Sequence, residues 1–210
     1  QDNTGNATGT LPKNYDNIIE DNNSISYDHS FHPDIVSIHL GTNDMAAEGE
    51  VGQSAMLDDV AFQNTYKNFI DEILSHHPCA NVIICYGNSK SDGYPSWTQQ
   101  LTRLRTIANN LVALYPEGNV AQLELPYTAE SWPAQPDDCG YGDAWHPSLC
   151  SHQEMSNKLV EKVNGMNVNW GTSNECTSVN TTNTITNLKN NTVSVFPNPA
   201  INHISVVGNN

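Results

Sequence analysis

The stretch GDAWHPSLCSHQEM, residues 142–155, holds a carboxylate and an imidazole at a spacing that suits proton transfer. Asp143 precedes His146 by three residues, Pro147 follows the histidine, and an apolar-periodic segment begins soon after. On a loop before a helix, the carboxylate can orient one imidazole nitrogen while the other faces solvent and takes a proton. The pattern therefore indicates a general base, and the alternative is a surface histidine near a helix start.

The sequence Gly-Thr-Asn-Asp, residues 41–44, directly follows an apolar run at 34–40. At the end of a strand, the Asn43 side-chain amide can point across a site and donate a hydrogen bond to a developing oxyanion. The alternative is a capping turn in which the Asn and Asp side chains bond nearby backbone. The position at a strand end favours a functional role, because that is where an α/β sheet places its site.

The segment 34–164 alternates between two hydrophobic patterns. Short apolar runs predict buried strands, and apolar residues at helical spacing predict amphipathic helices. The strands are expected at 34–40, 81–86 and 119–125, and the helices at 60–77, about 95–115 and about 151–164. Three strand–helix alternations imply an α/β fold with a parallel sheet covered by helices on both faces.

The segments on either side have a different composition. Residues 1–33 are rich in Asn, Asp, Thr and Gly with little periodicity, and we expect an irregular lead-in. Residues 166–191 are dominated by Asn and Thr, which is typical of a linker. Residues 192–210 return to alternating apolar residues around a Pro-Asn-Pro turn, which indicates the start of a small β module.

Composition and charge fit one core-forming domain with further segments attached. The chain has 210 residues, of which 37% are hydrophobic, and a formal net charge of −15 from 23 acidic and 8 basic residues. This charge argues against a surface for nucleic acid or an anionic membrane, so we expect a neutral or cationic partner. No apolar run approaches the roughly 20 residues that a bilayer span needs, so no membrane span is predicted.

The five cysteines have no C-x-x-C spacing, so a structural zinc site of that kind is not expected. Cys139 and Cys150 bracket the loop that holds Asp143 and His146. In an oxidising compartment, a disulfide between them would close this loop and contribute about 2–4 kcal/mol. Buried free thiols are the alternative.

Two stretches together resemble a known superfamily. PDIVSIHLGTND and GDAWHPSLCSHQEMSNKLVEKV resemble the third and fifth sequence blocks of the SGNH hydrolases, lipases and esterases with a three-layer flavodoxin-like fold. More narrowly, GTLPKNYD, YDHSFHPDIVSIHLGTND and the sequence around Trp145 resemble the acetylxylan esterases of carbohydrate esterase family two. The resemblance covers about residues 1–165. It implies a serine esterase without metal or other cofactor, acting on acetylated polysaccharide or oligosaccharide.

The resemblance also implies roles for individual residues. Asn43 matches an oxyanion-hole donor, His146 the general base and Asp143 the carboxylate that orients it, although some members use a backbone carbonyl instead of that carboxylate. Trp145 and Gly41 are assigned to substrate binding. An aromatic face such as that of Trp145 packs well on a sugar ring, and the alternative is a partly buried packing tryptophan.

The nucleophile is where this sequence departs from the superfamily. There the serine stands in a Gly-Asp-Ser motif after the first strand, upstream of the Gly-Thr-Asn-Asp block, and this chain contains no Gly-Asp-Ser. Ser89 follows a strand in the sequence Gly-Asn-Ser, but it comes after that block and is interpreted as part of a loop. We therefore expect a parallel sheet that is incomplete at the N-terminus and lacks its nucleophile block.

The C-terminal stretch VSVFPNPAINHISV resembles the start of the type A sorting domain of the type IX secretion system of Bacteroidetes, with Pro197, Asn198 and Pro199 carrying the match. This implies secretion machinery as a partner and a secreted or cell-surface protein. The expected organisation is a hydrolase domain at 1–165, a linker at 166–191 and the start of a sorting domain at 192–210.

Two other functions stay open on the sequence alone. A non-catalytic carbohydrate-binding or adhesion protein would keep the fold and lack the serine. A metal-dependent hydrolase is suggested by the eight histidines, among them His76, His77, His146 and His152. Their spacings match no zinc signature, and His76 and His77 stand at a predicted helix end, where imidazolium meets the helix dipole favourably. The esterase is therefore the leading hypothesis.

Overall fold

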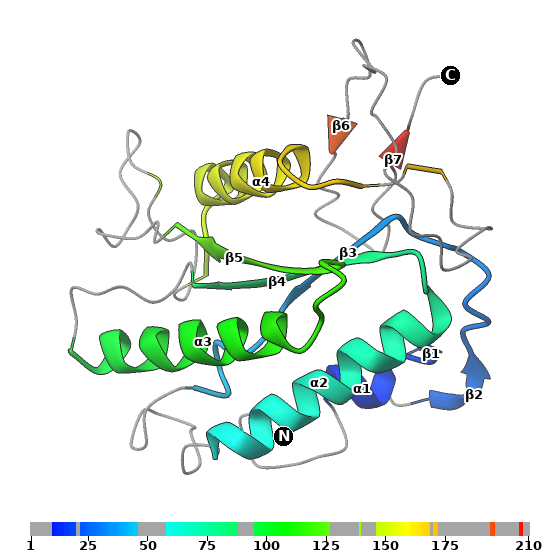
Figure 1. Cartoon of the computed structure of the whole chain (residues 1–210), viewed down its shortest axis with the longest axis horizontal. Coiled ribbons are helices and arrows are strands. Elements are labelled where there is room, and N and C mark those ends of the chain that lie inside the picture. The colour runs from blue at the N-terminus through cyan, green and yellow to red at the C-terminus, as the bar shows by residue number, and fades with distance from the viewer. Residues whose placement is uncertain are drawn as a thin grey trace. The chain divides into compact units, whose positions relative to one another are not determined.

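The computed structural model describes residues 10–19, 22–45, 58–87, 95–126, 139, 146–168, 170–171, 194–195 and 206–207. The chain divides into two compact units, Gln1–Cys176 and Thr177–Asn210. The elements of the first unit are α1 (Leu11–Asn14), β1 (Asn17–Ile19), β2 (Asn22–Ser26), β3 (Ile35–His39), α2 (Asp59–His76), β4 (Asn81–Gly87), α3 (Pro95–Ala113), β5 (Val120–Leu125) and α4 (Leu149–Asn164) (Figure 1). The second unit contains β6 (Ser194–Val195) and β7 (Val206–Val207).

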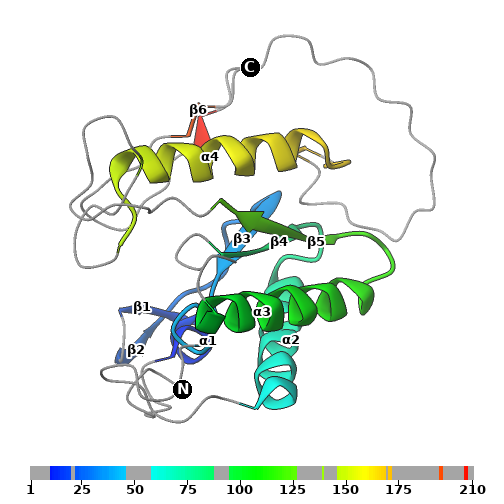
Figure 2. The same ribbon diagram turned by 90° about the vertical axis from the view of Figure 1, so that its left-hand side faces the viewer.

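Strands β3, β4 and β5 form a parallel sheet in that order. Ile35 pairs with Asn81 and Val82 pairs with Val120, so the three strands begin at the same edge. Helices α2 and α3 cover one face of the sheet and α4 covers the other, as two ribbon views show (Figure 1, Figure 2). The predicted α/β fold, a parallel sheet with helices on both faces, is confirmed.

The central strand β4 supplies side chains to two hydrophobic cores. Val82, Ile84 and Tyr86 pack in the core shared with α2 and α3. Ile83 and Cys85 point to the opposite face and pack in the core beside α4. Because successive side chains of a strand alternate between faces, a continuous apolar run suits a strand that is covered on both sides.

Helices α2 and α3 bury the apolar stripes that the helical spacing predicts. The buried residues of α2 are Tyr66, Phe69, Ile70 and Ile73, and those of α3 include Leu101, Leu104, Ala108 and Leu111. Helix α2 begins at an N-cap, where Oδ1 of Asp58 accepts a hydrogen bond from the Ala61 backbone N–H at 2.9 Å. The bounds of the elements from β3 to α4 agree closely with the predicted ranges.

The irregular lead-in predicted for residues 1–33 is wrong for the part of it that the structure describes. That part contains α1 and an antiparallel pair, β1 and β2, whose register shifts between Asn17 and Ile19. Strands of three and five residues are too short to show a readable alternation, and Asn-rich sequence favours turns. Pairing between the two segments, and not their local pattern, determines these elements.

The first compact unit extends beyond residue 165, where the hydrolase domain was expected to end. The Gly171 backbone N–H donates to Oδ1 of Asp34 at 3.0 Å, and Met166 packs in the core beside α4. Part of the expected linker therefore belongs to the first unit. In the second unit, β6 pairs with β7 in antiparallel fashion. Among the described residues, no helix is long and apolar enough to cross a membrane.

Candidate active site

The chain turns sharply after β3, where the Gly-Thr-Asn-Asp sequence begins. Gly41 is buried and has a φ of +106°, a conformation that residues with side chains rarely adopt. A Cβ atom at this position would lie 2.8 Å from Cδ2 of Leu104 and 3.1 Å from Cζ of Phe62. The structure thus gives Gly41 a packing role between β3 and the helices on this face. Its role in substrate binding stays a prediction.

Asn43 stands on the exposed side of this turn. The Met45 backbone N–H donates to the Gly41 carbonyl at 3.0 Å, and the Met45 side chain is completely buried. These contacts anchor the turn. The Asn43 side chain is exposed and makes no hydrogen bond to the residues that the structure describes. The amide is thus not occupied by capping within that part of the chain, and it can serve as a donor.

Asp44, the next residue, has a different environment. It is partly buried, and burial raises the pKa of its carboxyl above the usual range. Its carboxylate is therefore held in a poorly hydrated place beside the turn. Of the two polar side chains that end this motif, only Asn43 is exposed.

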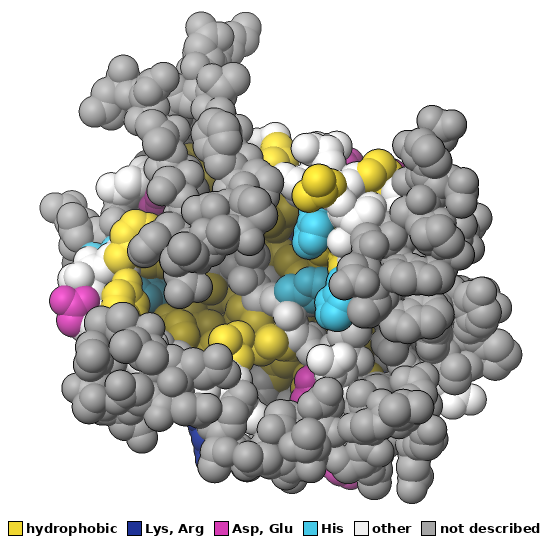
Figure 3. All heavy atoms as spheres, turned by 180° about the vertical axis from the view of Figure 1, so that it is seen from behind, with side chains coloured by type: hydrophobic (Ala, Val, Ile, Leu, Met, Phe, Trp, Pro, Cys, Tyr) yellow, Lys and Arg dark blue, Asp and Glu magenta, His cyan; other side chains and the backbone are white. Residues whose placement is uncertain are grey.

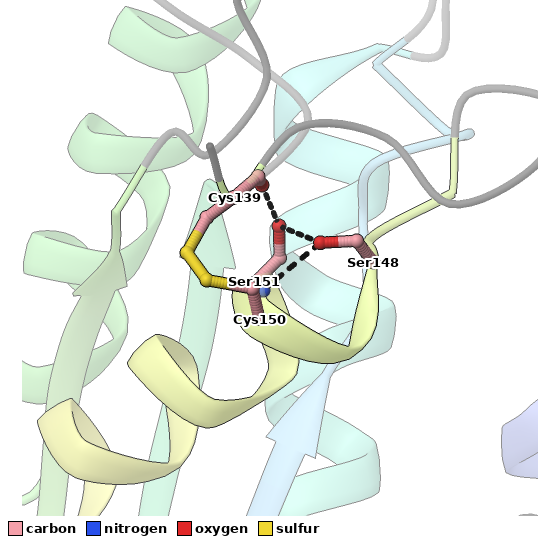
Figure 4. The surroundings of a disulfide bond; sticks show 4 residues. All are labelled: Cys139, Ser148, Cys150 and Ser151. Atoms are coloured by element: carbon pink, nitrogen blue, oxygen red, sulfur yellow. Dashed lines mark hydrogen bonds between the residues drawn. A yellow bond between two sulfur atoms is a disulfide. The ribbon is translucent and has the colours of Figure 1, made fainter. Parts of the chain in front are cut away.

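His146 lies just before helix α4, and the start of that helix is held by an N-cap, a hydrogen bond and a disulfide. The side chain of His146 is exposed. Ser148 is the N-cap residue, and its Oγ accepts a hydrogen bond from the Ser151 backbone N–H at 3.2 Å. The buried Ser151 side chain donates to the Cys139 carbonyl, and a disulfide joins Cys139 to Cys150 with their Cα atoms 4.8 Å apart (Figure 4). The disulfide and the hydrogen bond therefore join the chain on either side of the segment that contains His146.

The cysteines divide between bonded and buried positions. Cys139 and Cys150 form a disulfide, and Cys79 is also disulfide-bonded. Cys85 is a free thiol in the core, and burial raises its pKa to about 11. A thiol with such a pKa is almost fully protonated at neutral pH and is a poor nucleophile. Cys85 is therefore a poor candidate for a catalytic nucleophile.

The direction of α4 brings His146 to the edge of the sheet where Asn43 lies. Just beyond the end of α4, Gly171 is hydrogen-bonded to Asp34, which immediately precedes β3. The end of α4 is therefore near the amino ends of the strands, and its start, beside His146, is near their carboxyl ends. The ribbon view shows this antiparallel course of α4 over the sheet (Figure 1). Carboxyl ends are where α/β sheets place functional groups.

The remaining predicted site residues lie outside the described residues. These are Asp143, which would orient His146, and Trp145, which would contact the sugar. Ser89, interpreted as a loop residue, also falls outside them. The structure therefore brings Asn43 and His146 to one edge, and the roles of Asp143 and Trp145 stay predictions.

Sequence reasoning missed a group of aromatic and acidic side chains at the opposite edge of the sheet. Asp16 and His29 come from the lead-in, and His76 is the last residue of α2. Their separation along the chain gives no motif spacing that could have revealed them. The only signal was the pair His76 and His77 at the end of the predicted helix, which was weighed as part of a metal site but rated below the esterase because its spacing matches no zinc signature.

The fold is similar to that of solved carbohydrate esterases of family two. A family two carbohydrate esterase from Clostridium thermocellum, solved in complex with cellohexaose, superposes with a TM-score of 0.52 and 26% identity, over 68% of this chain and 39% of that one. A family 2 enzyme with a carbohydrate-binding domain from Corynascus thermopiles (Myceliophthora fergusii) has the same fold, with a TM-score of 0.61 and 23% identity, over 77% of this chain and 46% of that one.

The sequence comparison agrees with the structural one. The cellulase/esterase CelE of Acetivibrio thermocellus is 28% identical over 131 residues, which are 62% of this chain and 14% of CelE. The chain matches no protein-family model. It spans less than half of the length of the solved esterases and a small part of CelE. The homologues of this chain are therefore carbohydrate esterases, matched over part of their length.

Proposed function

We propose that this chain is a segment of a secreted serine esterase that removes acetyl groups from plant polysaccharide. The observation that supports the proposal is that Asn43 follows the carboxyl end of β3 while His146 precedes α4, which runs antiparallel to the strands, so both residues lie toward the carboxyl edge of the sheet. Acyl transfer needs an oxyanion donor, a general base and a nucleophile. Two of these groups come from residues at one edge, in a chain whose homologues are carbohydrate esterases.

In the proposed mechanism, a serine hydroxyl attacks the carbonyl carbon of an acetyl ester while His146 accepts its proton. The Asn43 amide donates a hydrogen bond to the oxyanion of the tetrahedral intermediate. His146 then returns the proton to the departing sugar oxygen, and water repeats the cycle to release acetate. Asp143 would orient the imidazole, and Trp145 and Gly41 would contribute to the sugar site.

The 210 residues contain no Gly-Asp-Ser, so the proposal places the serine on a segment outside this sequence. A secreted location is supported by the disulfide between Cys139 and Cys150, because disulfides persist in oxidising compartments. The match of Pro197, Asn198 and Pro199 to a sorting domain extends the proposal to the type IX secretion machinery as a partner.

The test compares residues 1–210 with the same chain joined to its natural upstream segment. Hydrolysis of p-nitrophenyl acetate and release of acetate from acetylated xylan are measured for both. Residues 1–210 alone should show no turnover above a His146→Ala variant, because imidazole activates a hydroxyl only within about 2.6–3.2 Å. The joined chain should be active, and His146→Ala should lower its kcat by at least about 10⁴.

His152→Ala is the matched control, because His152 is an exposed histidine of α4. Its activity in the joined chain should equal that of the unaltered protein. Activity of residues 1–210 that disappears on Ser89→Ala would refute the proposed external nucleophile. A folded, inactive joined chain that still binds xylan would favour the non-catalytic binding protein instead.

A further inference from the structure

A cluster of aromatic and acidic side chains lies where α2 ends and the chain approaches β3. The rings of His29 and His76 are stacked, with centroids 3.7 Å apart and planes 11° from parallel. Tyr15 packs against both rings, at 5.2 Å from His29 and 6.3 Å from His76. His77 adds a further ring 5.7 Å from that of His29. Histidines are thus concentrated here without any local sequence motif.

Asp16 completes a set of metal-ligating atoms. Its Oδ1 lies 2.7 Å from Nε2 of His29 and 3.8 Å from Nε2 of His76. One potential ligand atom from each of the three residues lies within 4.8 Å of the other two. In a tetrahedral site with bonds of about 2.0–2.1 Å, neighbouring ligand atoms are about 3.3 Å apart. The observed distances from Asp16, 2.7 and 3.8 Å, bracket that value.

Two histidines of the cluster are buried, and its other two members are partly exposed to solvent. His29 is 9% exposed and His77 is 4% exposed, and Nδ1 of each is buried without a hydrogen-bond partner among the described residues. The side chains of Asp16 and His76 are 53% and 35% exposed, so an ion and its water ligands can enter from solvent.

We propose that Asp16, His29 and His76 bind one divalent transition-metal ion, zinc above others, with water completing a tetrahedral shell. Two imidazoles and one carboxylate are a donor set that zinc prefers. Glu72 precedes His76 by one helical turn on the same face of α2, and it adds a second carboxylate nearby. The net charge of −15 also favours a cation.

On the face seen in Figure 3, the described side chains include histidines beside hydrophobic residues, and few lysines or arginines are visible among them. The His29 and His76 rings are stacked, so one of them has to rotate before both imidazole lone pairs can point at one ion. His76 is the more exposed of the two, and its ring is therefore the one that would rotate.

The position in the fold indicates a structural role for the ion. His76 ends α2 shortly before β4 begins, and the Asn81 backbone N–H donates to the Asp34 carbonyl at 2.9 Å, so this is the amino edge of the sheet. Asn43 lies at the carboxyl edge. The ion would join the segments that hold Asp16 and His29 to the end of α2. Metal binding would therefore stabilise the folded lead-in.

The test measures zinc binding to residues 1–210 by isothermal titration calorimetry, with metal content checked by mass spectrometry after dialysis. We expect one Zn²⁺ per chain and a melting temperature that rises with zinc and falls back with EDTA. Asp16→Asn and His76→Gln should each raise the Kd for zinc at least about tenfold. Both positions are partly exposed, so these variants should fold, which circular dichroism checks.

His152→Gln is the matched control, because His152 is an exposed histidine outside the cluster. Its zinc affinity should equal that of the unaltered chain. The proposal is overturned if the folded chain binds no zinc at one equivalent, or if both cluster variants bind zinc as tightly as the control.

Discussion

Gly41 and Asn43 show how one residue can position another. The positive φ of Gly41 and its contacts with Leu104 and Phe62 leave no space for a side chain. With Met45 buried beneath the turn, the backbone around Asn43 is held at both ends. An oxyanion donor is effective when it is fixed in place before the reaction, because no reorganisation is then needed as charge develops.

Replacement of Asn43 by alanine should test its role at this scale. In the joined, active chain, Asn43→Ala should lower kcat by roughly 10²–10³ with little change in KM, because the hydrogen bond strengthens only in the transition state. Steady-state kinetics on p-nitrophenyl acetate measure both constants. Asn64→Ala, which changes an exposed asparagine of α2, is the control and should leave both unchanged. Unchanged kcat in a folded Asn43→Ala variant would assign Asn43 to turn structure.

At the scale of elements, α4 is the helix that positions the base. Its start is fixed by the Ser148 cap, by the buried Ser151 side chain and by the disulfide from Cys150 to Cys139. Its length then places its other end near the amino edge of the sheet. A rigid helix of 16 residues spans about 24 Å, which is enough to cross the sheet and separate the two edges.

Removal of the disulfide should weaken this anchor. Its cysteines are separated by 11 residues, and closing a loop of that length is expected to contribute about 3 kcal/mol to the free energy of unfolding. Cys139→Ala/Cys150→Ala should therefore lower the free energy of unfolding by about 3 kcal/mol, which is measured as a shift of the urea midpoint to lower concentration. Ser148→Ala is the comparison, since it removes the cap and the contact with the Ser151 hydroxyl but keeps the disulfide, and it should cost about 1 kcal/mol. Equal unfolding midpoints for the double variant and the unaltered chain would show that the disulfide does not stabilise the fold.

At the scale of the whole molecule, two helical layers enclose one sheet. Arg103 pairs with Asp59 and Arg105 pairs with Glu124, so α3 is tied to both α2 and β5. The free thiol of Cys85 lies in the core between β4 and α4, and it is 4% exposed. Its exposure therefore requires separation of the layers and reports on global unfolding.

This gives a prediction for the native protein. Burial raises the pKa of Cys85 to about 11, so little thiolate is present at pH 8 and access is blocked as well. Iodoacetamide should leave Cys85 unlabelled in buffer and should label it in urea with the same midpoint as the loss of circular dichroism. Peptide mass spectrometry identifies the site. Labelling of Cys85 in the folded protein at pH 8 would contradict the enclosed core.

The sequence by itself determined the elements from β3 to α4 and their buried faces. The stripe through Tyr66, Phe69 and Ile73 and the apolar run of β4 are local patterns, so burial of one face or of both faces can be predicted from spacing alone. The candidate roles of Asn43 and His146 came from resemblance and strand-end position, and they stay predictions. The tertiary structure alone decided that α4 returns across the sheet to place His146 at the edge of Asn43. It also decided the pairing of β1 with β2 and the meeting of Asp16, His29 and His76. These contacts join residues far apart in the chain, and only the packing of whole elements determines them.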